Sequence, residues 1–203
     1  MKLEQKVNLG GADIYLEALG LAAQRALVSD IRNIARAAPP YSPETRFGKQ
    51  MSVRMTSAGK CGWMSDARGY RYEPKHPRGT DWPPMPQSLL DIWQAVAPDA
   101  RQPDCALINF YGEGARMGLH QDNDESDYSQ PVVSVSLGDE ALFRIGGTKR
   151  GGKTASHWLR SGDVLVLGGA ARLAYHGVDK TKHGSSSLLP DSGRINVTMR
   201  VVT

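Results

Sequence analysis

Residues 132–145, VVSVSLGDEALFRI, contain the pattern that decides the fold. Valine and serine alternate over 132–137, and a second run at 141–145 leads into a pair of glycines. Further short apolar runs follow at 164–167, 173–176 and 194–202. Several short strands in succession, with no helical pattern between them, predict an antiparallel sandwich or jelly roll.

Two amphipathic helices are expected upstream of these strands. The first has an apolar stripe over 27–35 and ends before Pro39, and the second covers 87–97 and ends before Pro98. Residues 41–80 hold many glycines and prolines, which favours strands and long loops over a second domain. The fold class is therefore α+β, with helices packed outside a C-terminal β-core.

The candidate metal ligands lie in and after residues 107–125, LINFYGEGARMGLHQDNDE. His120 and Asp122 are two residues apart, and in an extended segment such residues share a face. His176, in RLAYHG, is the expected third ligand from a strand elsewhere. Two histidines and one carboxylate on one side of a metal leave open positions, as in non-haem Fe(II) oxygenases. On spacing alone, a pair of surface-loop residues is the commoner interpretation of His-X-Asp.

The final strand, RINVTMRVV at 194–202, has two contrasting faces. Ile195, Val197, Met199 and Val201 alternate with Arg194, Asn196, Thr198 and Arg200. In a surface sheet the polar face would simply meet solvent. The alternative is an anion site, because each arginine can present a planar fork to a carboxylate. Asn109 and Tyr111 also share a face, so that both can point into one cavity.

Composition sets broad limits on the class of protein. The 203 residues suit one well-cored domain, and the formal net charge of +4 permits nucleic-acid binding without arguing strongly for it. No apolar run approaches the roughly 20 residues that span a bilayer, and the N-terminus lacks the apolar core of a signal peptide. Cys61 and Cys105 match no metal spacing and are interpreted as reduced thiols, so we expect a cytoplasmic protein. Three further histidines are expected at the surface: His76, His157 and His183.

Seven segments between residues 51 and 200 resemble, in family order, the AlkB-type Fe(II)- and 2-oxoglutarate-dependent dioxygenases. They are MSVRMT, GWMSDARGYRYEP, WPPMPQS, LINFYGEGARMGLHQDNDE, VVSVSLGDEALFRIGGTKR, RLAYHG and RINVTMR. The sequence departs from the family pattern at Phe110, where an arginine often stands, at the shorter-looking loop 75–81 and in the Ser-rich segment 179–191. These departures bear on substrate preference.

The resemblance implies a double-stranded β-helix core (a cupin-like jelly roll) at 101–203. Residues 1–100 would form an N-terminal extension with the helices and a nucleotide-recognition lid, the whole being one integrated catalytic domain. Iron would be held by the catalytic triad His120, Asp122 and His176. 2-Oxoglutarate would be bound by Asn109, Tyr111, Arg194, Asn196 and Arg200. The lid would carry Met55, Trp63 and Tyr70, with Asp124 and Arg150 near the substrate base.

Two roles are expected for the arginines of the final strand. Arg200 would anchor the far carboxylate of 2-oxoglutarate, and Arg194 would support the metal-bound end or hold Asp124 in place. Asp124 would attract bases methylated on a ring nitrogen, because these are cationic. Chemistry on a base edge requires a flipped base or a single strand, for which Trp63 and Tyr70 are suitable stacking partners.

The family implies oxidative demethylation of 1-methyladenine and 3-methylcytosine in DNA, preferably single-stranded, with RNA as an open second substrate. Fe(II) would be the cofactor, 2-oxoglutarate and dioxygen the cosubstrates, and formaldehyde a product. We expect a monomer with no membrane partner. Two alternatives stay open: the same chemistry on modified RNA or another methylated substrate, and a non-catalytic metal-binding jelly roll. Arg194 and Arg200 argue against the second, because a simple metal sensor needs no oxoacid clamp.

Overall fold

The computed structural model describes residues 1–45 and 47–203, and strands dominate this part of the chain. The helices are α1 (Leu21–Ala37), α2 (Gln87–Val96) and the short 3-10 helix η1 (Gly169–Ala171). The first strands are β1 (Lys6–Leu9), β2 (Ala12–Tyr15), β3 (Arg54–Gly59), β4 (Gly62–Asp66), β5 (Gly69–Glu73), β6 (Cys105–Tyr111) and β7 (Met117–His120). The remaining strands are β8 (Val132–Gly138), β9 (Glu140–Ile145), β10 (Ala155–Leu159), β11 (Val164–Leu167), β12 (His176–Lys182) and β13 (Arg194–Arg200).

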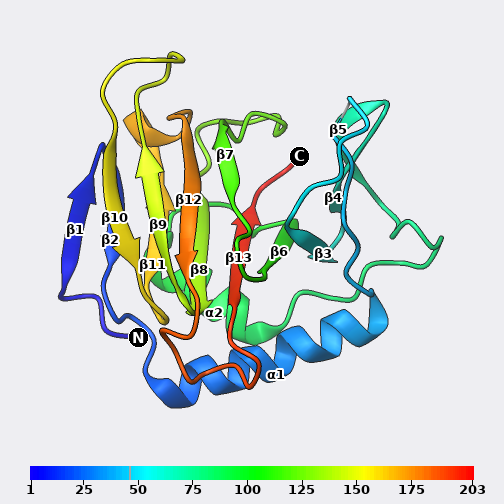
Figure 1. Cartoon of the computed structure of the whole chain (residues 1–203), viewed down its shortest axis with the longest axis horizontal. Coiled ribbons are helices and arrows are strands. Elements are labelled where there is room, and N and C mark those ends of the chain that lie inside the picture. Colours follow the sequence, from blue (N-terminus) through cyan, green and yellow to red (C-terminus); the bar gives the residue numbers. More distant parts are fainter. Residues whose placement is uncertain (46) are drawn as a thin grey trace.

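The strands form two main sheets and a separate hairpin. The major sheet has the order β1-β2-β11-β8-β13-β6-β3, and the minor sheet has the order β10-β9-β12-β7. The β4–β5 hairpin stands apart, on the opposite side of the molecule from β1 and β2 (Figure 1). Strands that are distant in sequence pair antiparallel within each sheet, as β13 does with β6 and β8. The predicted jelly-roll core with helices outside it is confirmed.

The two helices cover one face of the major sheet (Figure 1). Leu27 and Ile31 of α1 and Trp93 of α2 lie in the same buried cluster as Val197 and Met199 of β13. Burying an apolar helix stripe against an apolar sheet face removes both from water, which is the main favourable term in folding. The helices therefore occupy one side of the sheet and leave its other side to face the minor sheet.

The alternation predicted for the final strand is present, but its polar face does not meet solvent. All seven residues of β13 are buried. The apolar side chains point toward the helices, and Arg194, Asn196, Thr198 and Arg200 line a cavity between the two sheets. Two buried arginines require partners or a ligand, because an unpaired buried charge is costly. The surface interpretation of this strand is therefore wrong.

Several local predictions need correction. The segment predicted as a strand at 173–176 is a turn that ends where β12 begins, at His176. The sequence predicts none of the strands β1, β2 and β10, because runs of four or five residues are too short for their pattern to be recognised. His76, expected at the surface, is 3% exposed, and its ring packs edge-on against Trp82. The boundary between residues 100 and 101 stays a prediction, since β3 from the first part belongs to the same sheet as β6.

Candidate active site

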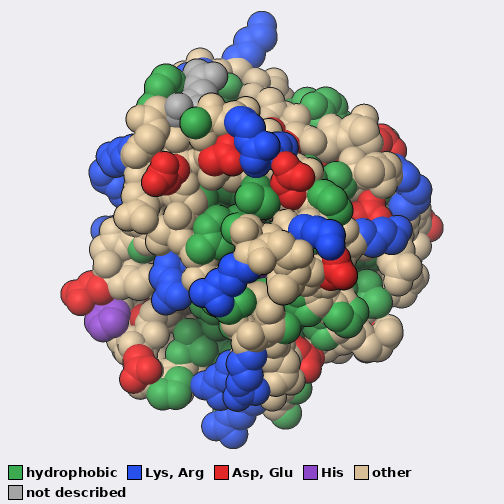
Figure 2. Space-filling model, turned by 90° about the vertical axis from the view of Figure 1, so that its right-hand side faces the viewer, with side chains coloured by type: hydrophobic (Ala, Val, Ile, Leu, Met, Phe, Trp, Pro, Cys, Tyr) green, Lys and Arg blue, Asp and Glu red, His purple; other side chains and the backbone are tan. Residues whose placement is uncertain are grey.

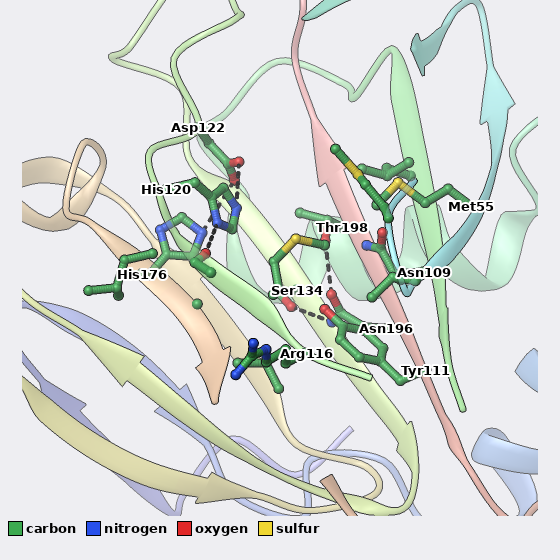
Figure 3. Close-up of a pocket in the computed structure, with 18 of the residues that line it drawn as sticks. Met55, Asn109, Tyr111, Arg116, His120, Asp122, Ser134, His176, Asn196 and Thr198 are labelled. Atoms are coloured by element: carbon green, nitrogen blue, oxygen red, sulfur yellow. Dashed lines mark hydrogen bonds and ion pairs between the residues drawn. The ribbon is translucent and has the colours of Figure 1, made fainter. Parts of the chain in front are cut away.

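The three expected metal ligands meet at one point between β7 and β12 (Figure 3). His120 ends β7, His176 begins β12, and the two residues are register partners across the strand pair. Asp122 follows in the loop after β7, with its carboxylate oxygens 3.7 Å from each histidine Nε2. One nitrogen or oxygen of each residue lies within 4.8 Å of the others, as ligands of a single ion must.

Both imidazole rings are oriented by the backbone. Nδ1 of His120 lies 2.9 Å from the carbonyl oxygen of Gly118, and Nδ1 of His176 lies 2.9 Å from that of Ala174. When Nδ1 donates to a carbonyl, the other nitrogen carries the lone pair that binds a metal. Both Nε2 atoms therefore face Asp122 in the form that a divalent cation needs.

Asp122 is prepared to complete this ligand set. Burial raises the pKa of its carboxyl, but the Arg200 guanidinium and the two imidazoles outweigh burial and hold that pKa well below its usual range. Burial lowers the pKa of His176, which keeps that ring neutral. Oδ2 of Asp122 is buried without a hydrogen-bond partner among the described residues. An orphaned carboxylate oxygen beside two imidazole nitrogens fits a divalent metal such as Fe(II).

The other end of the cavity is built for a small anion. The cavity has a volume of about 610 Å³ and extends from the triad to Arg194, which is 2% exposed. Arg194 donates from Nη2 to Ser136 Oγ at 3.0 Å and lies over the Tyr111 ring, 5.0 Å from its centroid. Its Nε and Nη1 are buried without partners in the described part of the chain. A buried guanidinium with unpaired donors calls for an anionic ligand, such as a carboxylate.

Asn109 and Asn196 line the same cavity as the metal triad (Figure 3). Oδ1 of Asn109 is buried without a partner, whereas Nδ2 of Asn196 donates to Ser134 Oγ at 2.7 Å. Thr198 donates to Oδ1 of Asn196 at 3.2 Å, so that the amide is held at both ends. The residues expected to bind 2-oxoglutarate therefore share one cavity, although Asn196 is already engaged by the protein.

Arg200 lies behind the metal ligands instead of at the far end. Its Nη2 is 2.8 Å from Asp122 Oδ1, its Nη1 donates to Tyr72 Oη at 3.3 Å, and its Nε is 3.4 Å from Glu125. Arg172 pairs with Glu125 at 3.0 Å and donates to the backbone oxygen of Asp122 at 2.6 Å. Tyr72, Glu125 and Arg172 were not singled out from the sequence, although each lies inside one of the family motifs.

The expected substrate residues are only partly brought together. Trp63 and Tyr70 of the β4–β5 hairpin stack with ring centroids 5.4 Å apart, and both line the cavity, as Met55 of β3 does. Asp124 accepts a 2.9 Å hydrogen bond from Trp63 Nε1, so the tryptophan holds it in place of Arg194. Arg150 lies in the β9–β10 loop over the Tyr175 ring and does not line the cavity.

Comparison with known proteins shows which family the chain belongs to. The model of the 2OG-Fe(II) oxygenase superfamily matches residues 15–200. An alpha-ketoglutarate-dependent dioxygenase AlkB homolog from Caulobacter vibrioides is 53% identical over 191 residues, which are 94% of this chain and 87% of that protein. The chain belongs to the AlkB-type dioxygenases.

Two further comparisons, one of sequence and one of structure, cover nearly the whole chain. Escherichia coli AlkB, an alpha-ketoglutarate-dependent dioxygenase, is 41% identical, with 95% of this chain and 91% of that protein covered. The solved structure of OsALKBH1 matches with a TM-score of 0.81 at 30% identity, over 97% of this chain and 99% of that chain. The enzyme class, Fe(II) and 2-oxoglutarate predicted from the motifs are confirmed. Of the helices described here, none has the length and apolar character required to cross a membrane.

Proposed function

We propose that this AlkB-type dioxygenase removes methyl groups from 1-methyladenine and 3-methylcytosine in DNA, preferably in single strands. One atom of dioxygen would end in succinate, formed with carbon dioxide from 2-oxoglutarate. The other would end in an N-hydroxymethyl base, which releases formaldehyde and a proton and leaves the neutral, unmodified base. The single observation that carries the proposal is the triad with its free Asp122 oxygen, in a cavity that also holds stacked Trp63 and Tyr70.

Names of related proteins support a nucleic-acid substrate. An Arabidopsis thaliana relative, 44% identical over 108 residues, is a DNA N(6)-methyladenine demethylase. A mouse relative, 29% identical over 133 residues, is a nucleic acid dioxygenase. Because the second name does not separate DNA from RNA, modified RNA is the second candidate substrate. A non-catalytic metal-binding jelly roll does not account for Nε and Nη1 of the buried Arg194, which have no partner among the described residues.

The metal would be held by His120, Asp122 and His176, and bound Fe(II) with 2-oxoglutarate and dioxygen supplies the oxidation. Arg194 would hold the far carboxylate of 2-oxoglutarate, because both its Nε and its Nη1 lack a hydrogen-bond partner among the described residues, whereas Arg200 lacks one only at Nε. Arg200 would fix Asp122 and offset negative charge at the metal end, since it already pairs with that carboxylate. The two arginines thus exchange the roles expected from the sequence.

The lid residues would select the base. A flipped or single-stranded base could stack against the Trp63–Tyr70 pair, an interaction worth roughly 1–3 kcal/mol per base. Trp63 donates its indole proton to one oxygen of Asp124, which leaves the other oxygen available to a cationic methylated base. Met55, 2% exposed, would form an apolar floor of the cavity. Arg150 would contact phosphate from its loop outside the cavity.

The test is mass-resolved turnover of a panel of methylated oligonucleotides, single- and double-stranded, in DNA and RNA. With Fe(II), 2-oxoglutarate and air, single-stranded DNA carrying 1-methyladenine or 3-methylcytosine should lose 14 mass units per event, about the mass of one CH2 group, in step with formaldehyde release. His120→Ala and omission of 2-oxoglutarate are the controls. Turnover that is unchanged in His120→Ala contradicts the metal assignment, and faster turnover on RNA favours the second candidate.

Location and assembly belong to the same proposal. Cys61 and Cys105 are both free cysteines, as is usual in the reducing cytoplasm. We expect the protein to act there as a monomer. Analytical ultracentrifugation at working concentration checks the assembly state, and a dimer mass contradicts it.

A further inference from the structure

The hydroxyl of Tyr72 connects the lid hairpin to the residues behind the metal site. It donates to Glu125 Oε1 and accepts from Arg200 Nη1 at 3.3 Å. Burial raises the pKa of Tyr72, so the hydroxyl keeps its proton and can donate and accept at once. Tyr72 is not among the described residues that line the cavity, so contact with a bound ligand or a stacked base does not explain its position.

The position of Tyr72 in the hairpin determines which loop residues the hairpin holds. Trp63 of β4 and Tyr72 of β5 are register partners, so their side chains lie on the same face of the hairpin. Trp63 binds Asp124 and Tyr72 binds Glu125, which are consecutive residues of the loop that also carries Asp122. One register pair of the lid therefore holds two neighbouring residues of the ligand loop.

Arg200 is placed between two buried carboxylates. Its Nη2 pairs with Asp122 Oδ1 at 2.8 Å, and its Nε faces Glu125 Oε1 at 3.4 Å. Tyr72 occupies Oε1 of Glu125, and Arg172 occupies Oε2 at 3.0 Å. With both oxygens of Glu125 engaged, Arg200 makes its shorter contact with Asp122. Without the Tyr72 hydroxyl, Oε1 would lack its donor and would draw the guanidinium away from Asp122.

We propose that Tyr72 is a positioning residue, which keeps Arg200 on Oδ1 of Asp122 and thereby keeps Oδ2 turned toward the metal. The inference rests on the proposed function only in taking the triad as the metal site. It predicts that loss of one hydroxyl in the lid weakens metal binding at a triad that this hydroxyl never touches. A purely structural tyrosine would change the stability of the hairpin and leave metal affinity unchanged.

The experiment measures the dissociation constant of Mn(II) for the full-length protein, from the electron paramagnetic resonance signal of free Mn(II). Tyr72→Phe removes one oxygen atom and keeps the ring. We expect its dissociation constant to rise about tenfold, the lower end of the range for residues that orient metal ligands. The visible spectrum of bound Co(II) should also change, because the carboxylate ligand is less firmly held.

Tyr41→Phe is the matched control. The Tyr41 hydroxyl also donates to the lid hairpin, at 3.4 Å from the backbone oxygen of Trp63, but within the described residues it makes no hydrogen bond to Arg200. Its Mn(II) affinity and Co(II) spectrum should match those of the wild type. The inference is overturned if Tyr72→Phe binds Mn(II) within twofold of the wild type, or if Tyr41→Phe weakens binding equally. Wild-type protein that binds no Mn(II) overturns the proposed function as well.

Discussion

Arg194 and Arg200 lie on the same face of β13, yet their guanidinium groups have different surroundings. In the described part of the chain Arg194 has two donors without a hydrogen-bond partner, whereas Arg200 pairs with Asp122 and lacks a partner only at Nε. Arg194→Ala should therefore weaken 2-oxoglutarate binding at least about tenfold, since a hydrogen bond to a charged group contributes roughly 1.5–3 kcal/mol. Its Mn(II) affinity should change little, while Arg200→Ala should lose Mn(II) affinity. Calorimetric titration of both ligands checks this, and equal losses in the two variants contradict the separate roles.

The environment of Asp104, just before β6, should make the free energy of unfolding depend on pH in the acidic range. Burial raises the pKa of its carboxyl, but Lys60 and the backbone N–H groups of Val202 and Thr203 outweigh burial and hold it below the usual 3.8. A lowered folded-state pKa means that the ionised carboxylate stabilises the fold above pH 3.8 and that this contribution disappears as the pH falls through the folded value. Lys60 is exposed, so most of the effect should come from the backbone donors.

Asp104→Asn should accordingly lower the free energy of unfolding at pH 7 by about 1 kcal/mol, and this difference should become smaller as the pH falls to 3. Urea unfolding at both pH values measures the two differences. A variant that is equally destabilised at pH 3 and pH 7 would show that the charge of Asp104 makes no contribution.

The sequence was sufficient to propose the metal ligands, but not to predict which arginine contacts Asp122. His120, Asp122 and His176 could be proposed together because they lie in segments that resemble the AlkB family, whereas the His-X-Asp spacing alone favours a surface pair. Alternation in β13 places Arg194 and Arg200 on one face, but it does not say which of them meets Asp122. That depends on where the loop after β7 returns to the sheet, which is a tertiary contact without a local signal.

At the level of elements, the pairing of β7 with β12 sets the distance between the two histidines. Gly177 follows His176, and a Cβ added there would lie 2.6 Å from the backbone oxygen of Met117 and 2.8 Å from that of Gly118. Backbone atoms cannot give way cheaply, so Gly177→Ala should push the strands apart. We expect a lower melting temperature and weaker Mn(II) binding, measured by calorimetry and titration.

Gly118→Ala is the control for this substitution. It lies on the partner strand β7, and a Cβ there would meet nothing within 4 Å. Its Mn(II) affinity should therefore equal that of the wild type. Mn(II) affinity unaffected by Gly177→Ala would show that the spacing of β7 and β12 does not control the metal site.

Which elements could be predicted depended on how strongly their patterns repeat. The 17 residues of α1 and the seven of β13 carry enough apolar periodicity to be recognised. β12 was placed too early, because its apolar run precedes His176, whereas the strand continues into KTK, whose burial alternates between intermediate and exposed. Its conformation is set by pairing with β9, not by its own apolar residues.

At the scale of the whole molecule, the helices that stabilise the fold and the residues of the active site lie on opposite faces of the major sheet. The helices cover one face of the major sheet, and the cavity lies on the other. On the side of the β4–β5 hairpin, Lys and Arg side chains are spread around hydrophobic ones (Figure 2). The sequence predicts helices outside a β-core but not that β1 and β2 extend the major sheet, because each strand is only four residues long.

This separation predicts that damage to the helix layer lowers stability without changing ligand affinity. Ile31 of α1 is 1% exposed in the cluster shared with β13, so Ile31→Ala should lower the free energy of unfolding by about 2–5 kcal/mol. In a protein of this size each kcal/mol lowers the melting temperature by roughly 2–4 °C. Well below that temperature, 2-oxoglutarate and Mn(II) affinities should equal those of the wild type, and of the exposed control Ser29→Ala. Weaker ligand binding by folded Ile31→Ala would mean that the helix layer also shapes the cavity through the sheet.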